Sequence, residues 1–146
     1  MVMQNRKVQF FYQKVRFSFL RRTALKLFVE TLFRLEKKNL KNLNVIFCTD
    51  NALLAINREF LNHDYYTDII TFPLSTKGQA VEAELYISVD RVRENAKKQD
   101  IPFSTELHRV LLHGCLHLTG YNDKSSQQIK KIREREDHYL RLYFNK

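Results

Sequence analysis

Apolar residues recur along this chain with two spacings, which predict where strands and helices lie. Short alternating or continuous apolar runs are typical of strands, and apolar residues three and four positions apart are typical of a helix face. Strand-like runs cover residues 8–12, 15–19, 44–49, 68–72 and 84–89. Helical spacing covers residues 22–37, a segment after Asp50 that runs through Phe60, residues 90–98, a segment from Pro102 and Ser104 to Gly120, and a segment after Ser125 that reaches Tyr143. Helices interleaved with about four strands predict an α+β fold with a mixed sheet.

Polar residues mark several ends of these elements. Asp50 is a candidate N-cap, and Ser125 with Gln128 has the spacing of a capping box. Gly120 suits the left-handed conformation that ends a helix. The segment 75–80, which contains Gly78, is predicted to be a flexible loop that borders the functional site. In the first helix, the predicted core face consists of Leu25, Phe28, Leu32 and Leu35.

Length and composition predict one folded domain over residues 1–146. The chain has 146 residues, of which 44% are hydrophobic, enough to form a core. Cys48 and Cys115 are too few for a disulfide framework and are expected to be buried thiols of a reducing compartment. Neither a signal peptide nor an apolar run long enough for a membrane span is visible, so we expect a cytoplasmic protein that does not bind membranes.

Positive charge is concentrated near the N-terminus. Residues 1–41 contain eleven Lys and Arg residues against Glu30 and Glu36, whereas the rest of the chain is balanced. This segment predicts a polyanionic partner, with the nearby aromatics Phe10, Phe11, Tyr12 and Phe17 available to stack on bases. The alternative is that the aromatics pack into the core and the charges only solvate a helix.

The most specific pattern is H-G-x-x-H-x-x-G-x-x-D, formed by His113, Gly114, His117, Gly120 and Asp123. Residues four apart on a helix lie one turn above each other, so His113 and His117 can bind one ion. A chain reversal at Gly120 would bring Asp123 to the same ion. Three protein ligands leave one position open for water or substrate, which is typical of catalytic zinc. We therefore predict one Zn²⁺ per chain, with other divalent transition metals, including Fe²⁺, as alternatives.

The spacing matches that of metzincin peptidases, in which a Glu beside the first His acts as general base. Here that position is Gly114, which argues against peptide hydrolysis. Two alternatives stay open from the residues alone. One is a metallopeptidase-like hydrolase, and the other is a non-catalytic factor with a structural metal.

The segment from Leu112 to Asp123 also resembles the HGxLHLxGYDH signature of the bacterial YbeY family. Residues 66–73 are similar to its PTDVLSFP strand and residues 83–87 to its GDIxI segment, in the same order and at similar spacing. The resemblance covers about Asn44 to Tyr143. It implies an α+β metallo-endoribonuclease specific for single strands, which acts in small-subunit (16S) ribosomal RNA 3′ end maturation and ribosome quality control. The implied partners are single-stranded and ribosomal RNA and the small ribosomal subunit or its assembly factors, with no small-molecule cofactor. With these partners, the non-catalytic alternative is a ribosome-associated factor with a structural metal.

Three positions depart from the family pattern. Asp123 stands where the family has a third metal-binding His, Asn122 stands where it has Asp, and Leu61 stands where a basic residue is frequent. Carboxylate oxygen also binds zinc, but it makes a coordinated water less acidic than a third neutral imidazole would. Arg58, one turn before Leu61, could replace the missing basic residue.

Four further residues near the pattern have candidate roles. Arg109 lies one turn before His113 and is a candidate phosphate contact, with a surface ion pair as the alternative. His108 is expected to be structural or exposed. Thr67 and Asp68 are candidates to hydrogen-bond the metal ligands, for example with Asp68 orienting a His. No protein general base is evident.

Overall fold

A computed structural model describes residues 6–19 and 21–145 of the chain; residues 1–5, 20 and 146, which fall within the predicted domain bounds, lie outside the described part. The elements in chain order are β1 (Val8–Tyr12), α1 (Arg22–Leu35), β2 (Leu40–Cys48), α2 (Asp50–Leu61), β3 (Ile69–Pro73), β4 (Val81–Ser88), α3 (Val89–Gln99), α4 (Phe103–Thr119) and α5 (Ser126–Phe144). The predicted single α+β domain with a four-stranded mixed sheet is confirmed.

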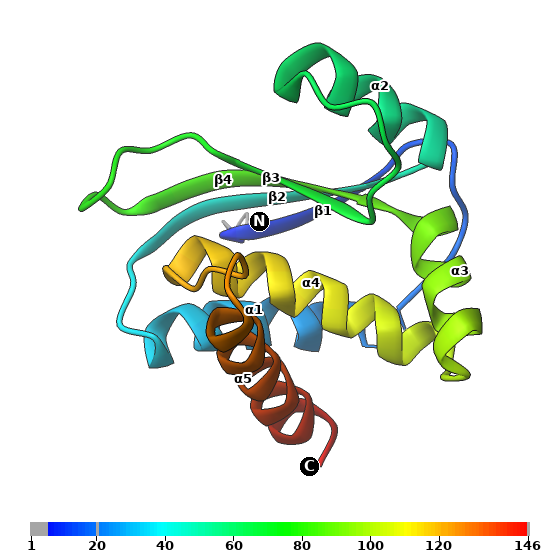
Figure 1. Cartoon of the computed structure of the whole chain (residues 1–146). Helices are drawn as coiled ribbons and strands as arrows, with labels where there is room; N and C mark the ends of the chain where they lie inside the picture. The colour runs from blue at the N-terminus through cyan, green and yellow to red at the C-terminus, as the bar shows by residue number, and fades with distance from the viewer. Residues whose placement is uncertain (1–5, 20, 146) are drawn as a thin grey trace, which may run out of the picture.

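The sheet has the strand order β1-β2-β4-β3, in which β1, β2 and β4 run parallel and β3 is antiparallel at one edge. Figure 1 shows α1, α4 and α5 on one side of the sheet and α2 on the other. Alternate residues of the strands, such as Val45, Phe47 and Leu85, are fully buried on the side of α1 and α4. No helix of the described part is long and apolar enough to cross a membrane.

Residues 15–19 form no strand, contrary to the prediction. Their alternating pattern instead reflects packing, because the rings of Phe17 and Phe19 lie 5.0 and 5.5 Å from the ring of Phe47. Strand β2 begins at Leu40, four residues before the predicted start. Its first residues do not alternate, because the buried Leu40 and Leu43 are separated by Lys41 and Asn42, where the register with β4 shifts. The core prediction for α1 holds for Leu25, Phe28 and Leu32 but is wrong for Leu35, which is 53% exposed.

The predicted helix signals are mostly confirmed. The capping box of Ser125 and Gln128 is present, and Gly120 ends α4 with a φ of 117°. Asp50 is not the N-cap of α2; the hydroxyl of Thr49 accepts the hydrogen bond from the backbone N–H of Ala52, and Asp50 is the first helical residue. At this position its negative carboxylate still interacts favourably with the positive N-terminal end of the helix dipole.

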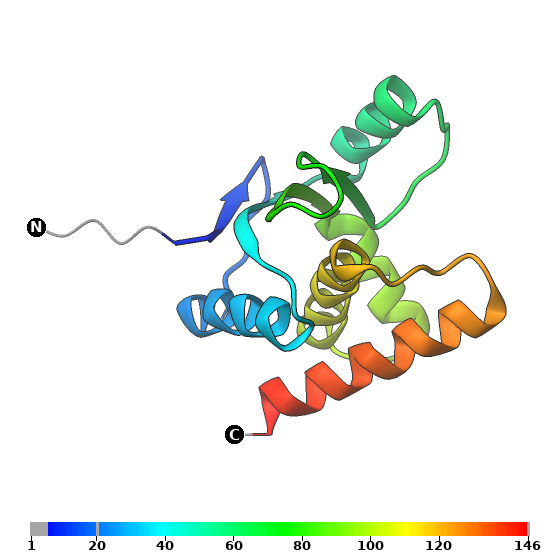
Figure 2. The same cartoon turned by 90° about the vertical axis from the view of Figure 1, so that its left-hand side faces the viewer.

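Helix α4 lies directly against the sheet at Gly114. A Cβ atom built at this position would lie 2.6 Å from Cδ1 of Ile69 and 3.0 Å from Cδ1 of Leu85. Glycine therefore lets the helix approach β3 and β4 more closely than any other residue would. Helix α4, the yellow helix in Figure 2, therefore contacts both the edge strand β3 and its neighbour β4.

Candidate metal centre and cleft

His113, His117 and Asp123 come together as their spacing predicts. Nε2 of His117 lies 3.0 Å from Nε2 of His113 and 3.2 Å from Oδ2 of Asp123, and Nε2 of His113 lies 3.4 Å from the same oxygen. The two imidazoles come from successive turns of α4, and the reversal at Gly120 returns Asp123 to them. The three side chains form a group that could hold a metal ion.

The Nδ1 atom of each imidazole, on the side of the ring away from the other ligands, also has a hydrogen-bond partner. Nδ1 of His113 lies 2.5 Å from Oε2 of Glu136, and Nδ1 of His117 lies 2.9 Å from the backbone oxygen of Tyr121. Because both partners only accept hydrogen bonds, each Nδ1 carries the proton and each Nε2 presents a lone pair. Two lone pairs and a carboxylate oxygen thus face one another, and a cation between them satisfies all three.

The electrostatics of the centre favour positive charge. Burial alone would lower the pKa of His113, but the hydrogen bond and charge of Glu136, with the charges of Asp123 and Asp68, outweigh burial and raise it. The field that favours a proton on this imidazole also favours a metal cation beside it.

Glu136 was not among the residues singled out from the sequence. It lies on α5 and is 2% exposed, and its other oxygen accepts a hydrogen bond of 3.0 Å from Arg109. A signal was present, because Glu136 follows Ile132 by four positions and therefore interrupts the apolar face of α5 with a carboxylate. A buried charged residue on such a face requires a partner, and here the partners are His113 and Arg109.

Arg109 and Asp68 make contacts other than those proposed for them. Arg109 donates to Glu136 and, over 2.7 Å, to Asp137, so the structure contains the ion pairs that were its alternative role. We regard Arg109 as positioning Glu136, and a phosphate contact stays a prediction. The Nδ1 atom of His113 pairs with Glu136 and not with Asp68, whose carboxylate lies 3.4 Å from the amide nitrogen of Asn95.

The remaining predictions are resolved by burial and position. His108 is structural: it is 6% exposed, and its Nδ1 lies 2.6 Å from the backbone oxygen of Ser104. Arg58 pairs with Asp64, and neither Arg58 nor Leu61 lines the cleft described below. Cys115 is fully buried, which raises the pKa of its thiol to about 12, so it is no thiolate ligand.

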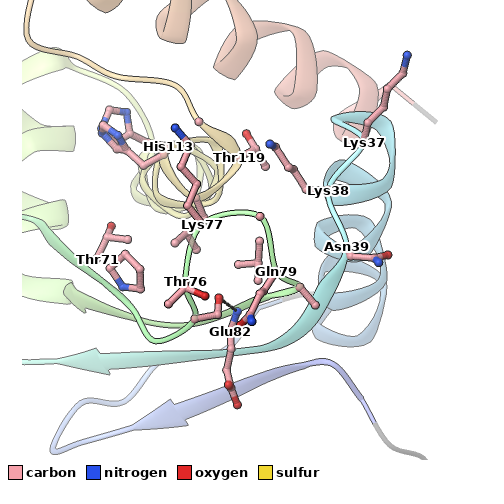
Figure 3. A pocket seen from close by; sticks show the side chains of 18 of the residues that line it. Lys37, Lys38, Asn39, Thr71, Thr76, Lys77, Gln79, Glu82, His113 and Thr119 are labelled. Atoms are coloured by element: carbon pink, nitrogen blue, oxygen red, sulfur yellow. Dashed lines mark hydrogen bonds between the residues drawn. The ribbon is translucent and has the colours of Figure 1, made fainter.

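A cleft of about 1170 Å³ opens at the three side chains. It is lined by β3, the loop between β3 and β4, the start of β4, the end of α4 and the end of α1 (Figure 3). The predicted loop 75–80 therefore does border the site. Thr67 and Asp68 line the cleft as well, and burial raises the pKa of Asp68 although the charge of His113 opposes that shift.

Replacing Glu136 by glutamine is expected to weaken Zn²⁺ binding by about 10–100-fold, because the single amide oxygen of glutamine cannot accept from both His113 and Arg109 and carries no negative charge beside the imidazole. The affinity can be measured by competition with a chromophoric chelator. Asp137→Asn is the matched control, since Asp137 pairs with Arg109 but does not touch His113. Equal losses in both variants would assign the effect to Arg109 and not to His113.

Comparison with known proteins gives a consistent result. The family model described as "Endoribonuclease YbeY" matches residues 3–143. A relative of that name in Cytophaga hutchinsonii is 43% identical over 140 residues, which cover 96% of this chain and 98% of the relative. Its namesake in Flavobacterium psychrophilum is 41% identical over 133 residues, covering 91% of this chain and 94% of the relative. A solution structure of a Thermotoga maritima protein superimposes with a TM-score of 0.62 at 26% identity, covering 94% of this chain and 89% of that one.

Proposed function

Because this chain belongs to the YbeY family and is an endoribonuclease, we propose that it is a metal-dependent enzyme that cuts single-stranded RNA at the cleft beside His113, His117 and Asp123. The observation that carries the proposal is the set of three acceptor atoms that face one another, with both Nδ1 atoms already hydrogen-bonded behind them. We propose Zn²⁺ as the metal, one ion per chain, because two imidazoles and one carboxylate are a common catalytic zinc set.

The residues around the centre have separable tasks. His113, His117 and Asp123 hold the ion, Glu136 and the backbone oxygen of Tyr121 fix the imidazole tautomers, and the open side of the group faces the cleft. A cation held by these three residues would supply Lewis-acid chemistry for the hydrolysis of an RNA phosphodiester. Gly114 provides no base, and its backbone is packed against the sheet and away from the cleft.

The cellular role that we propose is small-subunit (16S) ribosomal RNA 3′ end maturation and ribosome quality control in the cytoplasm. The partners would be ribosomal RNA and the small subunit or its assembly factors. The support is membership of the family, which both the sequence resemblance and the comparisons indicate, and an open cleft of about 1170 Å³ at the metal-binding group.

The first test combines elemental analysis with cleavage of RNA. We expect about one zinc per purified chain, cleavage of a single-stranded RNA that carries the precursor 3′ end of 16S rRNA, loss of cleavage with a chelator and recovery when Zn²⁺ is returned. The same strand annealed to its complement should be cut far more slowly. Casein is the control substrate for the peptidase alternative. Cleavage that persists without any bound metal would overturn the proposal.

A further inference from the structure

The cleft has two chemically different ends. The metal-binding group lies at one end, together with Asp68. Arg34, Lys37 and Lys38 line the other end, and Lys77 reaches into the space between. Figure 3 shows Lys77 pointing from the β3–β4 loop toward His113, Lys38 pointing from the end of α1 toward Thr119, and Lys37 pointing outward at the rim. Cationic side chains therefore form a path from the rim to the metal end.

These lysines are available for a ligand. Lys37, Lys38 and Lys77 are exposed and form no ion pair with any carboxylate of the described residues. The acidic neighbour Glu36 is occupied elsewhere, because its carboxylate accepts hydrogen bonds from Tyr121, Arg135 and Tyr139. Glu36 therefore does not neutralise the lysines that follow it in the sequence.

Lys37 occupies a position at which glycine is usual. Its φ is 60°, and two hydrogen bonds complete the turn that ends α1, from the N–H of Lys38 to the oxygen of Phe33 and from the N–H of Lys37 to the oxygen of Arg34. This hydrogen-bond pattern is a Schellman motif, whose left-handed residue is glycine in most proteins because a Cβ is unfavourable there. A lysine at this position adds charge to the rim in spite of that backbone cost.

The basic end and the metal end are held at a fixed separation. The hydroxyl of Tyr121 donates to Glu36 over 2.9 Å, and the backbone oxygen of the same tyrosine accepts from His117. Tyr121 thus links the end of α1 to a metal ligand through two hydrogen bonds. A strand bound at the lysines would be presented to the metal end in a constant register.

We propose that Lys38 and Lys77, with Lys37 at the rim, bind successive phosphates of the single-stranded RNA substrate and lead the strand from the end of α1 to the metal end. The inference rests on the proposed function and adds the path and direction of the strand. It also separates the basic residues of the N-terminal segment into those that line the cleft and those that do not. Arg21 and Arg22 lie at the other end of α1, about 20 Å away for a helix of 14 residues, and take no part.

The first test compares two double variants with equal loss of charge. Lys38→Ala/Lys77→Ala is expected to weaken binding of a fluorescein-labelled single-stranded RNA about tenfold and to make the slope of log K against log salt shallower by about 1.4, or about 0.7 for each phosphate contact. Arg21→Ala/Arg22→Ala should leave that slope unchanged. The complete protein is titrated in the presence of a chelator so that the RNA is not cut, and a gel shows after each titration that the RNA is intact. Equal slope changes in both pairs would overturn the proposal.

A second comparison separates charge from folding. Lys37→Gly and Lys14→Gly each replace a lysine whose backbone has the left-handed conformation, but Lys14 lies outside the cleft. We expect neither change to lower the melting temperature, because glycine accommodates this conformation. Only Lys37→Gly should weaken RNA binding, by about two- to threefold. RNA binding that is unaltered by Lys37→Gly would remove Lys37 from the path.

The kinetic pattern distinguishes this inference from the proposed function itself. If the path is correct, the Lys38/Lys77 double variant has a raised KM and nearly unchanged kcat. A wild-type protein that binds single-stranded RNA with the predicted salt slopes but never cuts it would contradict the proposed function and leave the path standing. A wild-type protein that cuts RNA with a KM insensitive to Lys38 and Lys77 would do the reverse.

Discussion

Replacing Asp123 by alanine is expected to abolish metal retention and to slow the cleavage of single-stranded RNA by about a thousandfold or more, while the chain stays folded. The loss follows from the several kcal/mol of transition-state stabilisation that a catalytic cation supplies, at about 1.4 kcal/mol for each factor of ten. Metal content is measured by elemental analysis, cleavage by gel assay and stability by urea unfolding.

The fold should survive because Asp123 contributes little to it. Its side chain is 43% exposed, it lies in the loop between α4 and α5, and its carboxylate contacts the imidazoles of His113 and His117. Surface substitutions of this kind usually change the free energy of unfolding by about 0.5 kcal/mol or less. We therefore expect the variant to keep the thermal transition of the metal-free wild type, since bound metal by itself stabilises the folded chain, and to keep the wild-type affinity for RNA.

Two variants serve as controls for this prediction. Asn122→Ala changes the adjacent exposed residue and should preserve both metal and activity. Asp123→His supplies a third imidazole at the same place and should restore metal binding. If Asp123→Ala instead lowers the stability by several kcal/mol, the metal is structural, because binding of a structural metal contributes directly to folding. The alternative of a metal that only holds the fold would then be favoured.

The metal-binding group could be predicted from the sequence because its geometry is local. His113 and His117 are related by a single helical turn, and Gly120 provides the reversal that returns Asp123 three residues later. Such relations are determined by backbone geometry and depend little on the rest of the fold. The same holds for the capping box, whose two hydrogen bonds both join Ser125 to Gln128, three positions later.

The residues that hydrogen-bond the metal-binding histidines could not be predicted in the same way, because their positions depend on tertiary packing. Glu136 reaches His113 across 23 residues only after α5 has packed on α4, whereas Asp68, which lies within the strand motif of residues 66–73, is directed toward Asn95. The N-terminal aromatics show the same limit. Phe10, Tyr12 and Phe17 pack around Phe47, as the core alternative predicted, and Phe11, which is 43% exposed, faces solvent.

Gly114→Glu, which would recreate the peptidase pattern, is expected to destabilise the protein by about 3 kcal/mol or more and to confer no peptidase activity. A side chain here must enter the space between α4 and the sheet, because even a Cβ would lie 2.6 Å from Ile69 and 3.0 Å from Leu85. Overpacking costs about 1–3 kcal/mol, and a buried carboxylate without a partner adds further cost. Urea unfolding and a casein assay measure the two outcomes.

Two further variants separate the causes. Gly114→Ala retains the steric overlap without the charge, and it should destabilise less, since alanine favours the helix by about 1 kcal/mol over glycine. Gln127→Glu adds the same charge at an exposed position in the first turn of α5 and should be close to neutral. A Gly114→Glu protein as stable as the wild type would mean that position 114 faces the cleft. If it is unstable as expected, the close contact of α4 with the sheet is itself the reason that this chain has no carboxylate beside its first histidine. Under the proposed function, a cation held by His113, His117 and Asp123 would then have to activate water without a peptidase-type base at position 114.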